Sequence, residues 1–148
     1  MPKAIGVLPV AIGLGFGLMI ALVGCVQSGG QVADWPADPI ASSRQSDAAP
    51  AEFRQREPLS SCGNIELVQG ETVPDSAWAC MDAASGSGAE LTVVQPTTEG
   101  DPIVTFYRVG PNIRGMDVIT DSTLDTFGFG WLVQHCVDTV DAREPIGC

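Results

Sequence analysis

The sequence predicts an α+β fold in which one short helix packs on a sheet of about four antiparallel strands. Apolar residues recur at helical spacing within residues 71–88, and beyond residue 90 they alternate with polar residues over short segments. Glycine and proline separate these segments, which indicates short connections. Four of the five cysteines lie in the same part of the chain, where disulfide bonds would stabilise a core of this small size.

The first 24 residues are typical of a secretory signal, because Lys3 is followed by an uncharged and largely apolar stretch over residues 4–24. The residues Leu22-Val23-Gly24-Cys25 that end this stretch resemble the lipobox of bacterial lipoproteins. The resemblance implies cleavage before Cys25 and a diacylglyceryl group on its sulfur. Acyl chains such as palmitate would then hold the protein on the extracytoplasmic face of the cell membrane. An uncleaved transmembrane anchor is the alternative, because the apolar stretch is nearly long enough to span a bilayer.

Residues 25–61 comprise the lipidated cysteine and a segment that we expect to be a disordered tether. Small residues, proline and scattered charges dominate it, as in "WPADP" and "SSRQSDAAPAEF". Such a composition buries too little apolar surface to fold alone. Trp35 and Phe53 are then isolated apolar side chains near a surface, and the folded domain spans residues 62–148.

The helix is predicted within residues 71–88. Thr72 is a suitable N-cap, Pro74 is tolerated in the first turn, and Asp75 suits the positive end of the helix dipole. The stretch Gly86-Ser87-Gly88 ends the helix. Its buried stripe would consist of Val73, Ala77, Cys80 with Met81, and Ala84.

The strands follow the helix along the chain. Turns are predicted at residues 99–102 and 110–112, where glycine and proline meet acidic or amide side chains. Short connections of this kind favour antiparallel neighbours. The predicted strands are residues 90–95, 103–109, 112–120 and 130–137.

Once Cys25 is lipidated, the remaining cysteines are Cys62, Cys80, Cys136 and Cys148. An even number in an exported chain predicts disulfide bonds, and four cysteines allow three pairings. We favour Cys62–Cys80 and Cys136–Cys148, because each pair is local. The chain has no C-x-x-C motif, so thiol exchange and a zinc site have little support.

The composition is strongly acidic. The chain has 18 acidic residues and seven basic ones, a formal charge of −11, and removal of Lys3 with the signal changes this charge to −12. The six basic residues that remain are all arginine. This balance disfavours nucleic acid, whose phosphates need basic side chains, and also disfavours a basic patch on anionic lipid.

Two stretches, "TTEGDPI" (97–103) and "DSTLDTFG" (121–128), are followed by Cys136 and a final "IGC". Together they resemble a family of small secreted Gram-positive lipoproteins that is defined as a domain of unknown function. The resemblance covers residues 91–148 and implies an α+β layout with a Cys136–Cys148 disulfide. It implies no activity, because none is assigned to the family. Cys62 and Cys80 lie outside this pattern.

Acidic side chains gather in these two motifs, and the candidate binding residues are Glu99, Asp101, Asp121 and Asp125. Oxygen-rich clusters suit Ca²⁺, so a module that binds calcium or another metal with oxygen ligands is one alternative function. The second motif is not an EF-hand loop, because its Asp spacing differs and no Glu closes it. The structural alternative is that the carboxylates cap turns by accepting backbone hydrogen bonds.

Catalytic patterns are weak in this chain. Two carboxylates would suit glycoside cleavage, but the domain is small for a substrate cleft. His135, the only histidine, would need a nucleophile such as Ser87, which lies in a Gly/Ser loop and not in a nucleophile elbow. A small envelope hydrolase is therefore a disfavoured alternative, and no cofactor is expected. The sequence favours a non-enzymatic envelope lipoprotein that binds a protein or a glycan through its two turn motifs.

Overall fold

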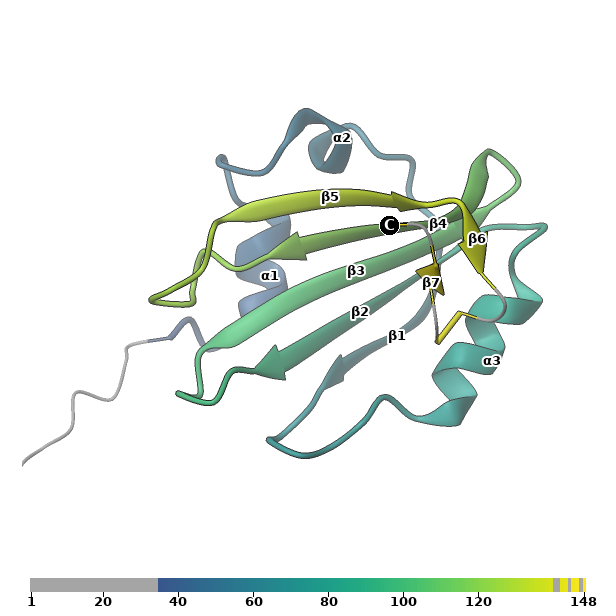
Figure 1. The fold of residues 1–148 in the computed structure, drawn as a ribbon. Coiled ribbons are helices and arrows are strands. Elements are labelled where there is room, and N and C mark those ends of the chain that lie inside the picture. Colours follow the sequence, from purple (N-terminus) through teal and green to yellow (C-terminus); the bar gives the residue numbers. More distant parts are fainter. Residues whose placement is uncertain (1–34, 140–141, 144, 147) are drawn as a thin grey trace, which may run out of the picture. The chain divides into compact units, whose positions relative to one another are not determined.

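The computed structural model describes residues 35–139, 142–143, 145–146 and 148. The predicted signal at 1–24, the lipidation site Cys25 and the first part of the predicted tether lie outside the described residues. The described chain is α+β, with short helices and one large sheet (Figure 1). No helix within the described ranges combines the length and apolar character that a membrane crossing needs.

A five-stranded mixed sheet with the strand order β1-β2-β3-β4-β5 forms the centre of the fold. Its last four strands are successively antiparallel, and they are the four predicted strands with every bound displaced by one residue. Two further strands, β6 (Asp138–Thr139) and β7 (Pro145–Ile146), form a separate two-stranded sheet. The four predicted strands are β2 (Ala89–Pro96), β3 (Pro102–Gly110), β4 (Ile113–Asp121) and β5 (Trp131–Cys136).

The prediction of a wholly antiparallel, four-stranded sheet is wrong in one strand. β1 (Ser60–Glu66) pairs in parallel with β2 at the edge of the sheet. Its sequence, "SSCGNIE", lacks the alternation of a half-buried strand, and a register shift between Ser61 and Gly63 interrupts its pairing. A helix connects β1 to β2, which provides the long crossover that parallel neighbours need.

That connecting helix is α3 (Asp75–Ala83), which confirms the helix predicted within residues 71–88. The predicted Thr72 cap is wrong, because Pro74 occupies the N-cap position and no side chain caps the first turn. Ala77 and Met81 are buried, as the predicted stripe requires. They pack on one face of the sheet in a core whose other buried members are Ala89, Leu91, Val93, Val109, Met116, Val118, Cys136 and Ala142.

The opposite face of the sheet is covered by the segment predicted to be a disordered tether. Here α1 (Pro39–Arg44) and α2 (Ala51–Arg54) pack on the sheet (Figure 1), so the tether prediction is wrong for these residues. Phe53 is 1% exposed, and its ring lies 4.6 Å from that of Phe106. The polar composition of the segment suggested disorder, but a few apolar side chains are enough to pack it on the sheet. These are Ile40, Ala49 and Phe53.

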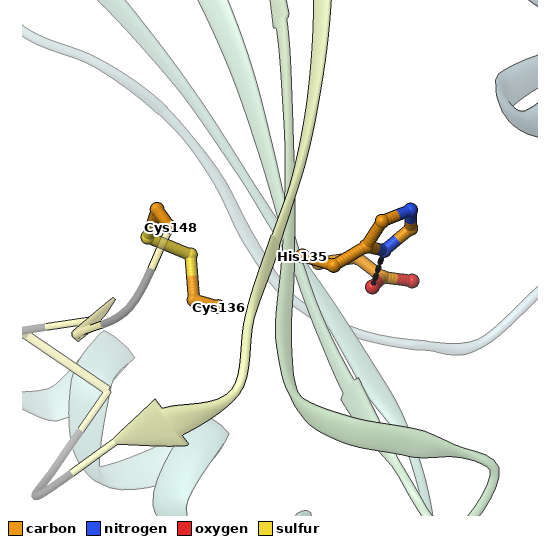
Figure 2. The surroundings of a disulfide bond; sticks show 4 residues. His135, Cys136 and Cys148 are labelled. Atoms are coloured by element: carbon orange, nitrogen blue, oxygen red, sulfur yellow. Dashed lines mark hydrogen bonds and ion pairs between the residues drawn. A yellow bond between two sulfur atoms is a disulfide. The ribbon is translucent and has the colours of Figure 1, made fainter.

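Both predicted disulfide bonds are present. Cys62–Cys80 joins β1 to α3, and Cys136–Cys148 joins β5 to the C-terminal residue. Figure 2 shows that Cys136 and its neighbour His135 point to opposite sides of β5, as successive residues of a strand must. The first disulfide fixes the crossover helix against the edge strand, and the second holds the C-terminal end at the α3 side of the sheet.

Candidate functional site

The two turn motifs meet at one end of the sheet. The first motif forms the turn between β2 and β3, and the second forms the loop between β4 and β5. Val104 near the start of β3 pairs with Asp121 at the end of β4, so both connections leave the sheet at the same end. The backbone N–H of Thr126 donates a 2.9 Å hydrogen bond to Asp101 and joins the two connections directly.

Asp101 is buried and stabilises its own turn as well as the neighbouring loop. Its backbone N–H donates to the Thr97 hydroxyl at 3.1 Å, and its carbonyl accepts from the backbone N–H of Thr97 at 2.8 Å. Its carboxylate accepts from Thr126. These contacts account for both the threonine that begins the first motif and the aspartate near its end.

Asp121 is also buried and links the loop to α1. One carboxylate oxygen accepts hydrogen bonds from the backbone N–H and the hydroxyl of Thr123, at 2.9 and 2.7 Å. The other oxygen accepts from the hydroxyl of Ser43, a buried residue of α1, at 2.6 Å. The carboxylate is therefore engaged on both oxygens, which matches the structural alternative considered for this residue.

Asp125 and two glycines fix the shape of the β4–β5 loop. The Asp125 carboxylate accepts from the backbone N–H of Phe127 at 3.0 Å. The base of the loop is closed where Gly130 accepts from both the backbone N–H and the hydroxyl of Ser122. At Gly128 an added Cβ would lie 2.0 Å from the carbonyl oxygen of Ser122, so no other residue fits. The loop is thus held by its own hydrogen bonds.

Of the four candidate binding residues, three serve in turn and loop structure. Glu99 is exposed and makes no hydrogen bond within the described residues. No group of three or more His, Cys, Asp or Glu side chains in the described part of the chain is placed to hold a metal ion. Glu99 is therefore left exposed, whereas Asp101, Asp121 and Asp125 position the loop.

The side chains that the loop presents are aromatic, and sequence reasoning missed them. Phe127 is 72% exposed and Phe129 is fully exposed. We call Glu99, Phe127 and Phe129 the aromatic tip. The available signal was the stretch "TFGFG", in which two large apolar residues alternate with glycine inside a loop and not inside a strand.

His135 has a partner other than the one considered from the sequence. Its Nδ1 lies 2.7 Å from a carboxylate oxygen of Asp117 on β4, and the side chain is exposed at the surface (Figure 2). The two residues are direct cross-strand neighbours. The geometry is that of a surface pair on adjacent strands, and the Ser87–His135 pair considered for catalysis is not formed.

Two hollows lie away from the aromatic tip. One, of about 390 Å³, lies beside Trp78 of α3 and Tyr107 of β3, whose rings meet edge to face at 5.1 Å. Burial raises the pKa of the Tyr107 hydroxyl above its usual value. The other, of about 330 Å³, is lined by arginine side chains and one carboxylate.

No known protein family, curated protein or solved structure matches this chain. The resemblance of the two turn motifs to small Gram-positive lipoproteins, and of residues 22–25 to a lipobox, therefore stays a prediction. Most residues of the second motif (121–128) are explained by the hydrogen bonds and close contacts that shape the β4–β5 loop.

Proposed function

We propose that the protein is a lipoprotein anchored through Cys25 on the extracytoplasmic face of the cell membrane, where its domain binds a partner without catalysing a reaction. The signal-like residues 1–24 and the lipobox-like ending support the anchor. Two disulfide bonds support an oxidising compartment outside the cytoplasm. The binding role is supported by the aromatic tip.

One observation carries the binding role: Phe127 and Phe129 are exposed on a loop whose backbone is fixed. Each buried phenylalanine contributes about 1.5–3 kcal/mol on leaving water. A loop that is already ordered loses little conformational entropy when it docks, so more of this free energy is available for binding. Exposed aromatic side chains in such a setting are typical of interface anchors.

The occupant that fits this tip is a protein with an apolar pocket and a basic rim. Asp125 accepts a hydrogen bond from the backbone N–H of Phe127, and Glu99 lies in the turn that Asp101 joins to the same loop. The mature chain as a whole carries −12, that is −11 with Lys3 removed. Such charge disfavours an anionic lipid surface. It favours a basic rim on the partner, because complementary charge speeds encounter and selects the partner.

Photo-crosslinking in intact cells tests this proposal. A photoreactive phenylalanine analogue replaces Phe127, and the same analogue replaces the exposed Val68 as the control position. Reagents that react with amines are unsuitable, because Lys3 is the only lysine and leaves with the signal. We expect one abundant adduct from position 127 and none of the same mass from position 68.

The adduct is expected to disappear when Phe129→Ala and Glu99→Gln are added to the probe-bearing protein. Near-ultraviolet circular dichroism checks that the combined variant is folded. Identical adducts from both probe positions, or an adduct that survives the double substitution, would show that the tip is not the binding surface.

A glycan is a second candidate ligand, favoured by the hollow at α3. Trp78 and Tyr107 provide aromatic faces there, and polar side chains suited to sugar hydroxyls line it: Glu71, Thr72, Asp75, Gln95 and Arg143. Titration with solubilised wall polysaccharide, followed by tryptophan fluorescence, measures this. A saturable change in fluorescence that is absent in Trp78→Leu would support glycan binding in this hollow. If the fluorescence of the wild-type protein does not change, the glycan hypothesis is wrong.

A further inference from the structure

Half of the arginines in the mature chain gather around one carboxylate. Arg56 and Arg108 lie 2.9 and 3.2 Å from the Glu90 carboxylate, and Arg44 lies 3.7 Å from it. We call these four residues the arginine cluster. In a chain of charge −11, such a concentration of positive charge is unexpected from composition.

Packing of the first segment on the sheet assembles the cluster. Glu90 and Arg108 are cross-strand neighbours on β2 and β3. Arg44 is the last residue of α1, and Arg56 follows α2. Arg56 lies over the ring of Phe53, 3.6 Å from its centroid, and donates to the Phe53 carbonyl at 2.8 Å. The cluster therefore exists only when the segment before β1 covers the sheet.

The cluster has more positive charge than its surroundings neutralise. The side chains of Arg108, Glu90 and Arg56 are only 8%, 13% and 17% exposed. Burial lowers the pKa of the Arg108 guanidinium, while the Glu90 carboxylate opposes this change. Asp117 lies opposite Arg108 on β4 but pairs with His135. Buried charge without a partner is costly, so an added anion would stabilise this cluster.

Arg44 is the residue of the cluster with nitrogen donors left for a ligand. Arg44, whose side chain is 39% exposed, makes its hydrogen bonds to Asn64 and Thr92 and its contact with Glu90 through Nη2 alone. Its Nε and Nη1 have no partner within the described residues. The buried Nε of Arg108 lies at ion-pair distance from Glu90 but lacks hydrogen-bond geometry.

A hollow of about 330 Å³ opens beside Arg44 and Arg56, whereas Arg108 does not line it. Ser61 contributes a hydroxyl that accepts from the backbone N–H of Gly63 at 3.1 Å, and its own O–H is left to donate. The hollow lies near the start of β2, whereas the aromatic tip lies beyond the end of β2. Its lining consists of Arg44, Arg56, Pro58, Leu59, Ser61 and Glu90.

We propose that this hollow binds a phosphate monoester or inorganic phosphate. Such a group carries about −1.5 to −2 charges at pH 7, which matches three guanidinium groups that share one carboxylate. Guanidinium groups donate charge-assisted hydrogen bonds to phosphate oxygens, and the Nε and Nη1 of Arg44 are left to donate such bonds. The source is either free phosphate or a terminal phosphate on an envelope lipid or polymer. This inference is independent of the proposed function of the aromatic tip.

Calorimetric titration of the mature, detergent-solubilised protein with inorganic phosphate, at constant ionic strength set by chloride, tests the proposal. We expect saturable binding at one site and a Tm that rises with phosphate but not with chloride. Arg44→Gln should weaken binding by about tenfold, because it removes a positive charge and a charge-assisted hydrogen bond. Arg54→Gln, on the exposed side of α2, is the matched control and should bind as the wild type does.

Glu90→Gln should change phosphate affinity in the direction opposite to Arg44→Gln. It removes the carboxylate that competes with the ligand, so the folded variant should bind phosphate more tightly than the wild type. Glycerol 3-phosphate should compete with inorganic phosphate, and a phosphodiester of the same size should compete less, which identifies a monoester ligand. Absence of binding to the wild-type protein, or equal binding by wild type and Arg44→Gln, would overturn the proposal.

Discussion

Gly128 shows how a single residue sets the geometry of the aromatic tip. A Cβ at this position would overlap the carbonyl oxygen of Ser122, so Gly128→Ala must displace the loop. We expect a loss of about 1–3 kcal/mol in the free energy of unfolding and loss of the crosslink from position 127. Urea denaturation measures the first effect. Gly86→Ala is the control, because no atom lies within 4 Å of its Cβ position, and its stability should change little.

Asp121 and Glu99 allow a structural carboxylate to be compared with one that we propose contacts a partner. Asp121→Asn weakens bonds that Ser43 and Thr123 donate to a buried, charged acceptor. It should cost about 1.5–3 kcal/mol. Glu99→Gln is exposed and should change stability by less than about 0.5 kcal/mol. Thermal unfolding of both variants tests this assignment. Equal stability of the two variants would mean that the bonds of Asp121 are not made in solution.

At the scale of elements, the segment before β1 behaves as part of the domain. Phe53 contacts the rings of Phe106 and Trp131, with centroids 4.6 and 4.7 Å away. Phe53→Ala should therefore cost about 3–5 kcal/mol of unfolding free energy. Phe127→Ala makes the same chemical change at an exposed position and should cost little. If both substitutions change the free energy of unfolding by a similarly small amount, the segment before β1 is not packed on the sheet and is a tether.

The helices and strands differ in how well the sequence predicts them. α3 and the four antiparallel strands were predictable because each has a periodic apolar pattern with glycine or proline at its ends. β1 was not, because its sequence lacks an alternating apolar pattern. α1 and α2 were not, because both are short and gain their stability from long-range packing. The turn between β2 and β3 was predictable from its glycine and proline, but the hydrogen bonds of the two acidic motifs were not predictable in detail. The arginine cluster joins Glu90 to arginines that lie 18 to 46 positions away along the chain (108 − 90 and 90 − 44), so no local pattern indicates it.

For the whole molecule, the proposed anchor makes a prediction about location. Cys25→Ser removes the sulfur that would receive lipid, so the variant should either remain uncleaved with its apolar signal and migrate at higher mass, or lose the signal and appear in the medium without lipid. Immunoblots of the fractions measure this. Glu99→Gln is the control and should fractionate with the wild type. Unchanged processing and membrane retention of Cys25→Ser would exclude the lipoprotein anchor.

The packing of α1 and α2 on the sheet also limits how far the domain could move from a membrane if Cys25 carries the proposed lipid. With a tether that ended at residue 61, the domain would be separated from Cys25 by 36 residues; with Trp35 already part of the domain, nine residues remain. Nine residues span at most about 35 Å, whatever their conformation. A protein held on Cys25 would therefore search a shallow layer above the lipid headgroups, and its partner must project into that layer or diffuse through it.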